Sequence, residues 1–236
     1  MQIFIICGYG IPTSIETDRS YQTYLAIVFN TIYEIARNKS AMIIPCGGPT
    51  KCDPPFTGTE AELIAGHLSH LVARNEVKRH TLEWKILSED QSLSTLENLL
   101  FSEQLIQAHN LTGTVTIFCE KTREVRLKIF ADHIFGIGVA VVQAIDFDLT
   151  KNRYLDQEVL AKKEGLALKE GLWTLEEPTR IQKHHEFFQK KFEFLRRRQS
   201  EGLSHIDAVT EWFQNEKNII RELMPDHPLL KEFTDH

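Results

Sequence analysis

Five short apolar runs, separated by segments of helical length, constrain the fold of this chain more than any other feature. The runs cover residues 1–7, 40–46, 81–89, 112–119 and 138–146. Between them, apolar residues recur at helical spacing in residues 19–37, 59–74, 94–109 and 122–135. Continuously apolar runs are typical of strands buried on both faces of a parallel sheet. We therefore predict an α/β fold, a Rossmann-like three-layer sandwich with a mainly parallel sheet of about five strands.

The pattern changes after about Asp148, where the strand signals stop. Helical spacing continues in residues 156–170, 177–198 and 205–223. Gly171 and Gly202 are expected to break these helices. We predict two domains, a Rossmann-like ligand-binding domain at residues 1–150 and a helical C-terminal extension at residues 151–236. Because three helices alone would bury little surface, the extension is expected to pack on the first domain.

The longest of these helical segments carries three distinct groups of side chains. The first group is apolar and is expected to pack the helix on the first domain. It consists of Phe187, Phe188, Phe192, Phe194 and Leu195. The run His184-His185-Glu186 lacks the spacing of an HExxH motif and is expected at the surface. Residues 196–198 are arginines in a mixed-charge pattern, which predicts a solvated helix face.

The composition excludes several classes of function. With 42% hydrophobic and 25% charged residues, the chain resembles an ordinary soluble globular protein. A formal net charge of -6 provides no basic excess, so no nucleic-acid partner is expected. The apolar runs are too short for a signal peptide or a membrane span, which predicts a cytoplasmic protein with no membrane partner. The oligomeric state is left open.

Small and polar residues follow the predicted strands at their carboxyl ends, where open α/β sheets bind ligands. Gly8, Gly47 and Gly48 follow the first two strands, and their N–H groups could approach a ligand closely, although tight turns would also explain them. The acidic residues after the third and fifth strands are Glu89, Asp90, Asp146 and Asp148. Carboxylates suit a ribose hydroxyl, a cationic group or Mg²⁺, whereas a phosphate would suit glycine N–H groups with Arg123 or Arg126.

The stretch SEDQSLSTLENLLFSEQL, residues 88–105, contains a possible helix start. Ser94 and Glu97 fit a capping box, in which the serine caps the helix and the glutamate bonds back to it. Thr57 and Glu60 fit the same pattern ahead of another predicted helix. On this interpretation both glutamates are structural caps, worth about 1 kcal/mol each.

The same stretch holds more polar residues than a cap requires. A helix cap uses one or two polar side chains. Glu89, Ser92 and Asn98 crowd the same turn without a capping role, and Thr95 lies at the helix mouth. This surplus indicates a ligand-binding site.

E-D-Q-S-L-S-T-L-E-N, residues 89–98, resembles the E-x-x-S-x-x-T-x-E-N signature of the YdcF/SanA/ElyC-like family of bacterial α/β proteins. C-G-G at 46–48 with T-E-A at 59–61 is similar to that family's S-G-G … E-A segment, and I-C-G at 6–8 to its L-G-G opening. The order and approximate spacing agree over residues 2–145, and the helical C-terminal half resembles the soluble YdcF type. The resemblance implies a Rossmann-like fold with a ligand pocket built from these loops. It also implies S-adenosylmethionine as a possible cofactor, since a family member has been associated with it.

One segment departs from the family pattern. The T-S-x-Y-H-x-x-R-A segment that often follows the fourth strand is F-C-E-K-T-R-E-V-R here, so the histidine is missing and Arg126 stands for the family arginine. If that histidine is the family's acid/base, its absence argues against catalysis. The expected ligand-binding residues are Gly8, Gly47, Gly48, Glu89, Ser92, Thr95, Asn98 and Arg126.

Two functional hypotheses follow. The first is a cytosolic protein that binds a nucleotide-like or S-adenosylmethionine-like small molecule at the carboxyl edge of the sheet, and acts on it as a hydrolase or transferase. Glu97 and Glu60 are then the acid/base candidates. The second is a non-catalytic metabolite-binding or regulatory module, with a protein-interaction role for the helical tail. No metal site is predicted, because the four cysteines form no CxxC pair, and a need for Mg²⁺ is left open.

Overall fold

The computed structural model describes residues 1–8, 15, 18–50, 58–147, 157–227 and 229–232. The chain divides into two compact units. The first covers Met1–Lys51 and Thr57–Lys151, and the second contains Asn152–His236. This division lies next to the predicted domain boundary. The packing of the extension on the first domain stays a prediction.

The first unit is built on a five-stranded, all-parallel sheet with the strand order β3-β2-β1-β4-β5. Its strands are β1 (Gln2–Cys7), β2 (Ala41–Cys46), β3 (Trp84–Ile86), β4 (Thr114–Glu120) and β5 (Ala140–Ile145). β1 lies between β2 and β4, with Ile5 opposite Ile44 on one side and Ile117 on the other. The predicted parallel α/β sheet is therefore confirmed.

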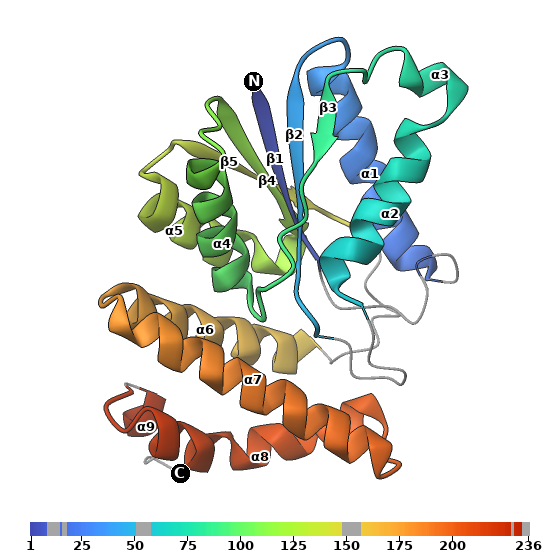
Figure 1. The fold of residues 1–236 in the computed structure, drawn as a ribbon. Helices are drawn as coiled ribbons and strands as arrows, with labels where there is room; N and C mark the ends of the chain where they lie inside the picture. Colours follow the sequence, from blue (N-terminus) through green and yellow to red (C-terminus); the bar gives the residue numbers. More distant parts are fainter. Residues whose placement is uncertain (9–14, 16–17, 51–57, 148–156, 228, 233–236) are drawn as a thin grey trace. The chain divides into compact units, whose positions relative to one another are not determined.

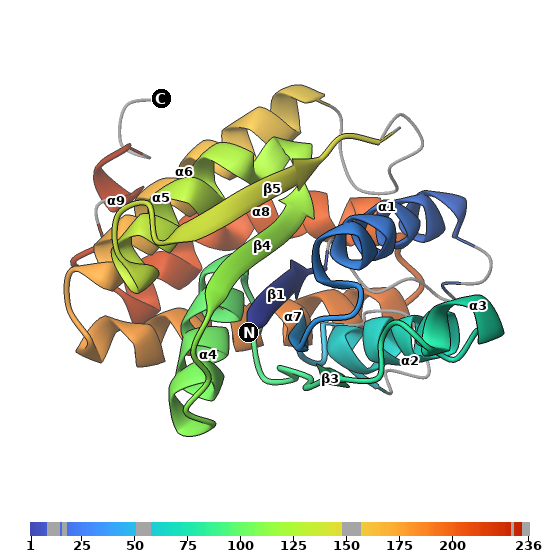
Figure 2. The ribbon, with the colours of Figure 1, turned by 90° about the horizontal axis from the view of Figure 1, so that it is seen from above.

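Helices cover both faces of this sheet. They are α1 (Arg19–Ala36), α2 (Glu60–Val72), α3 (Asn75–Lys78), α4 (Thr95–Ala108) and α5 (Glu124–Phe135), with the 3-10 helix η1 (Lys121–Arg123). Figure 1 and Figure 2 show α1 and α2 on one side of the sheet and α4 and α5 on the other. The arrangement completes the predicted three layers.

The central strands are buried along nearly their whole length, as their continuously apolar sequences predicted. All six residues of β2 are buried, and so are Ile3–Cys7 of β1. The edge strand β3 is shorter than predicted, because the chain leaves the sheet after Ile86. It returns at Glu89, which forms a single parallel bridge with Cys46 at the end of β2. This bridge places the polar stretch that follows Glu89 beside the ends of the central strands.

The second unit consists of helices α6 (Gln157–Leu175), α7 (Thr179–Ser200), α8 (His205–Leu223) and α9 (Leu229–Glu232). α6 continues through Gly171, so the break predicted there was wrong. Glycine costs a helix about 1 kcal/mol relative to alanine, and the burial of nearby Trp173 outweighs that cost. The break predicted at Gly202 is confirmed, because this residue has a φ of +99° just after α7.

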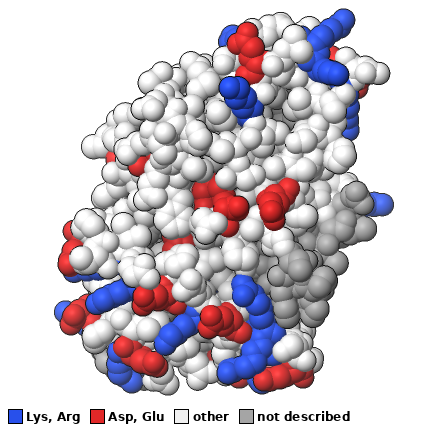
Figure 3. All heavy atoms as spheres, in the orientation of Figure 1, with Lys and Arg blue, Asp and Glu red and all other residues white. Residues whose placement is uncertain are grey.

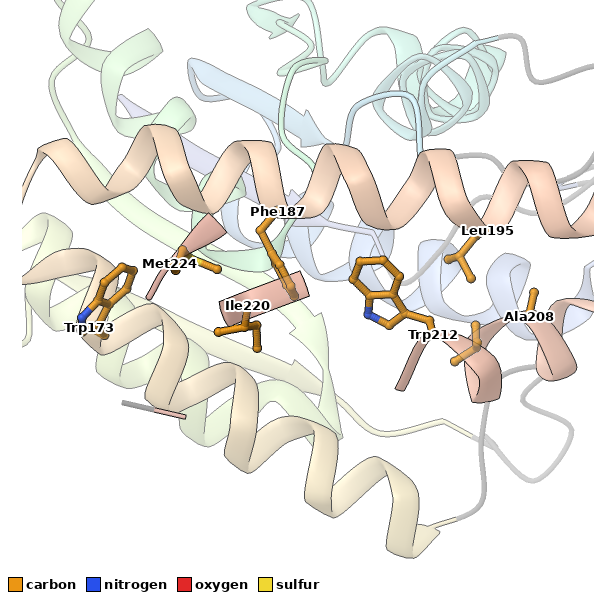
Figure 4. Close-up of a cluster of buried hydrophobic side chains, with 8 residues drawn as sticks. Trp173, Phe187, Leu195, Ala208, Trp212, Ile220 and Met224 are labelled. Atoms are coloured by element: carbon orange, nitrogen blue, oxygen red, sulfur yellow. The ribbon is translucent and has the colours of Figure 1, made fainter. Parts of the chain in front are cut away.

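The helical unit encloses a hydrophobic core of its own, which extends along α7 (Figure 4). The Trp212 ring of α8 lies 5.6 Å from the rings of Phe187 and Phe194. Phe187 and Leu195 are buried in this core, and Phe188, Phe192 and Phe194 pack against it. The apolar residues of α7, which we expected to pack on the first domain, thus pack within their own unit.

His184 is buried, which corrects the surface position expected for it. Its Nδ1 lies 2.5 Å from Glu170 Oε1, and the Thr174 hydroxyl donates to the same oxygen at 3.0 Å. Burial alone would raise the pKa of Glu170, but the charge and hydrogen bond of His184 lower it overall. The sequence pattern missed this pair, because its members are far apart in the chain.

Charged side chains of both signs are interspersed where α7 and α8 are in view (Figure 3). Arg198 pairs with Glu201 and Glu211, and Lys190 lies 3.3 Å from Glu222. These pairs agree with the mixed-charge helix face predicted from the sequence. Among the described helices, none has both the length and the apolar character needed to cross a bilayer.

Candidate functional site

The strand order places the candidate site. From β1 the chain adds β2 and β3 on one side, and then crosses back to add β4 and β5 on the other. The segments that follow β1 and β4 therefore diverge at the carboxyl edge, and open α/β sheets bind ligands in such a crevice. Of the residues considered above, Thr57 and Asp148 lie outside the described residues.

Glu60, the first residue of α2, reaches over the ends of β1 and β2. The Tyr21 hydroxyl of α1 donates a hydrogen bond to its Oε1 at 2.5 Å, and both side chains are buried. A Cβ on Gly8 would lie 2.1 Å from Glu60 Cδ, and one on Gly47, where φ is +134°, would lie 2.7 Å from Glu60 Cβ. These two glycines therefore provide the space that the Glu60 side chain occupies.

Glu60 does not cap α2, so the capping box predicted for Thr57 and Glu60 was wrong. The cap is Thr59, whose hydroxyl accepts a hydrogen bond from the Glu62 N–H at 3.2 Å. The Glu62 carboxylate accepts from the Thr59 N–H at 2.9 Å and completes the box. The Glu60 side chain instead lies at the strand ends, where it accepts the hydrogen bond from Tyr21.

The backbone amides of Gly47 and Gly48 are already used within the protein. The Gly47 N–H donates to the Glu89 carbonyl at 3.0 Å, and the Gly48 N–H donates to the Ser92 carbonyl at 2.7 Å. A Cβ on Gly48 would also lie 2.7 Å from that Ser92 oxygen. This geometry favours the close-packing interpretation of these glycines over a phosphate cradle built from their N–H groups.

Glu89, Ser92 and Asn98 form one buried hydrogen-bonded cluster. Glu89 Oε1 accepts from the N–H groups of Gln91 at 2.8 Å and Ser92 at 2.9 Å. The Ser92 hydroxyl lies 2.5 Å from both Glu89 Oε2 and Asn98 Oδ1. Burial raises the pKa of Glu89, although the hydrogen bonds from Ser92 and Gln91 oppose the shift. The residues that capping did not explain therefore come together, as predicted.

Three cysteines lie at or beside the ends of neighbouring central strands. Burial raises the pKa of Cys7 to about 11, against a hydrogen bond with the Asn98 side chain. Burial also raises the pKa of Cys46 and of Cys119. A thiolate is the nucleophile, so thiols that are neutral at pH 7 do not suit a nucleophilic role. Within the described ranges, no three His, Cys, Asp or Glu side chains are placed to hold a metal ion.

Glu97 lies at the start of α4 with no exposed surface. The predicted cap at Ser94 is confirmed, since its hydroxyl accepts from the Glu97 N–H at 3.2 Å. The Glu97 carboxylate accepts from the N–H of Leu93, the residue before the cap, at 2.6 Å. Thr95 is the first residue of α4 and is also buried. This geometry favours a structural role for Glu97 and leaves Glu60 as the stronger acid/base candidate.

The basic residue that reaches the end of β1 is Arg123 rather than Arg126. Its guanidinium donates to the Gly8 carbonyl at 2.6 Å and pairs with Glu120 at 3.2 Å. Arg126 is buried in α5, with its guanidinium 6.0 Å from the centre of the Phe130 ring. An arginine that follows a strand is a recognisable sign of a contact at the strand ends, but the sequence has two such residues, Arg123 and Arg126, and does not distinguish them.

Sequence reasoning missed Tyr21 altogether. The signal was present, because Tyr21 and Tyr24 lie one turn apart near the start of α1, and their hydroxyls meet the strand ends. The Tyr24 hydroxyl donates to the carbonyl of Cys7 at 2.7 Å. A tyrosine on the buried face of a helix usually directs its hydroxyl to a specific partner.

Fold and site together define a parallel α/β protein with a buried polar cluster at the carboxyl edge of its sheet, next to the point where the strand order reverses. Comparison of the chain with models of protein families, with curated proteins and with solved structures finds no match. The function is therefore inferred from the geometry of the described residues.

Proposed function

We propose that the carboxyl edge of the first unit binds a nucleotide-like or S-adenosylmethionine-like metabolite. One observation carries the proposal: buried polar side chains from separate segments converge around the end of β1. Glu60 comes from α2, Asn98 from α4 and Glu89 from the segment between β3 and α4. Capping requires none of these three side chains. The same segments carry the resemblance to the YdcF-like family, and this supports kinship with that family as part of the proposal.

The charges at this edge favour the nucleoside part of such a ligand over its phosphates. The Gly47 and Gly48 N–H groups donate to backbone carbonyls, and the Arg123 guanidinium is held by Gly8 and Glu120. Carboxylates accept hydrogen bonds from ribose hydroxyls and amino groups, and they attract a sulfonium or an ammonium. An S-adenosylmethionine-like molecule carries all of these groups.

Thermal unfolding in the presence of ligands tests the proposal. The panel is S-adenosylmethionine, S-adenosylhomocysteine, adenosine, AMP and ATP, each with and without Mg²⁺. A ligand at about 100 times its Kd should stabilise the protein by ~2.7 kcal/mol and raise its Tm measurably. Glu60→Ala and Asn98→Ala should remove the shift. Glu62→Ala is the matched control, because it removes a carboxylate in the same turn of α2 that accepts a hydrogen bond from the Thr59 N–H. No shift with any ligand would contradict the proposal.

Whether the site also performs a hydrolase or transferase reaction depends on Glu60. If it does, Glu60→Gln should abolish turnover of the ligand even at ligand concentrations that saturate the variant. The alternative, a non-catalytic metabolite-binding or regulatory module, is favoured by the complete burial of Glu97, the other acid/base candidate. Incubating the wild-type protein with each bound ligand and analysing the products separates these two alternatives.

A further inference from the structure

We propose that Tyr21 is the positioning residue of this site: its hydroxyl donates to the Glu60 carboxylate and holds it over the end of β1, and so selects ligands that present a hydrogen-bond donor or a positive charge. The inference rests on the proposed binding site and goes beyond it by naming the residue that selects the ligand.

The position of the Tyr21 hydroxyl is set by a backbone hydrogen bond and by the packing of the ring. Asp18 is the N-cap of α1, and its side chain accepts a hydrogen bond from the Tyr21 N–H at 2.9 Å. The ring is fully buried and lies edge-on to the Tyr24 ring, with 6.2 Å between the centroids. A hydroxyl held in this way meets Glu60 Oε1 at 2.5 Å. Little side-chain entropy remains to be lost when a ligand binds.

Three separate elements shape the place where the Glu60 carboxylate lies. Gly8 follows β1, Gly47 follows β2 and Tyr21 comes from α1. Any larger side chain at Gly8 would collide with the carboxylate itself, because its Cβ would lie 2.1 Å from Cδ and 2.1 Å from Oε1. Such convergence is more than a helix needs at its first residue, where Thr59 and Glu62 already form the cap.

The chemistry of the pair determines which ligands fit. The Tyr21 phenol donates to Glu60 Oε1, and donation from a phenol stabilises the ionised form of a carboxylate more than the protonated form. An ionised carboxylate is complementary to a donor or a cation, and it repels a phosphate. We therefore expect the wild-type protein to bind adenosine more tightly than AMP.

Tyr24 supplies a matched control on the same helix. Its ring is as fully buried as that of Tyr21, and its hydroxyl also makes a short hydrogen bond, 2.7 Å to the Cys7 carbonyl. Tyr24→Phe therefore removes a comparable buried hydrogen bond without removing the contact with Glu60. Effects common to both variants are structural, and effects confined to Tyr21→Phe belong to the pair.

A double-mutant cycle in the ligand-free protein tests the pair itself. The unfolding equilibrium constants of wild type, Tyr21→Phe, Glu60→Gln and the double variant should reveal a coupling of at least threefold, and the cycle with Tyr24→Phe should reveal a smaller one. Absence of coupling, or equal coupling for both tyrosines, would overturn the inference.

Affinity measurements test the selection of the ligand. Tyr21→Phe should weaken adenosine and S-adenosylmethionine binding about tenfold, while Tyr24→Phe should weaken it less. Equal losses in the two variants, or tighter binding of AMP than of adenosine, would overturn the inference even if ligands bind. If no ligand of the panel binds to the wild-type protein, the proposed function fails, and ligand selection by Tyr21 fails with it. The double-mutant cycle still shows in that case whether Tyr21 and Glu60 interact.

Discussion

Glu60 and Glu97 show how two glutamates in similar sequence contexts acquire different roles. Each lies near a helix start and each was compatible with a capping box. The Glu97 carboxylate accepts from the Leu93 N–H within its own helix start. The Glu60 carboxylate instead meets Tyr21, which is 39 residues away in the chain. The difference arises from side chains on another helix, so it belongs to the folded structure rather than to the local pattern.

Glu97→Gln should therefore act on stability and not on the ligand. The amide keeps the size of the side chain but loses the charge that strengthens the hydrogen bond from Leu93 at 2.6 Å. We expect a loss of about 1 kcal/mol in the free energy of unfolding, measured by chemical denaturation, and ligand affinity within twofold of wild type. If the variant keeps its stability but loses ligand binding, Glu97 contributes to the ligand site and not only to the helix.

The buried thiols predict a loss of stability at alkaline pH. The pKa of Cys7 is raised from 9.0 to about 11 in the folded protein, so the unfolded state releases this proton first. Its contribution to stability is fully present below pH 9 and falls as the pH rises, by about 1 kcal/mol at pH 10. Denaturation curves between pH 8 and 10 should show this decline, and Cys7→Ala should make it shallower. An unchanged slope in the variant would exclude Cys7 as the source.

At the scale of secondary-structure elements, most of the fold was predictable and the partners within the site were not. β1 and β2 are apolar throughout because both their faces are buried, and continuous runs of this kind are easily recognised. The cluster of Glu89, Ser92 and Asn98 was also predictable, because its members are close in the sequence. Two other features depend on knowing the first residue of a helix to within two positions. One is the capping box at Thr59, and the other is that Arg123 rather than Arg126 contacts Gly8. Patterns locate helix ends less accurately than that.

At the scale of the whole molecule, each of the two units carries its own core and its own buried ionisable groups. In the helical unit, burial lowers the pKa of His227 to about 4, despite the opposing effect of Glu170. The His227 ring lies 4.5 Å from the Trp173 ring, and the Arg180 guanidinium lies 4.4 Å from the centre of the same ring. The tryptophans divide usefully between the units, with Trp84 in the first and Trp173 and Trp212 in the second.

This distribution allows the acid stability of the helical unit to be measured separately. A histidine whose folded pKa is depressed stabilises the fold above the unfolded value of 6.5 and loses that contribution as the pH falls toward 4. In a Trp84→Phe background, fluorescence reports on the helical unit, and its unfolding free energy should fall by about 2 kcal/mol between pH 7 and pH 5. His227→Gln should remove most of this decline, whereas His185→Gln, on α7, should leave it in place. An equal decline in all three proteins would show that groups other than His227 cause the acid sensitivity.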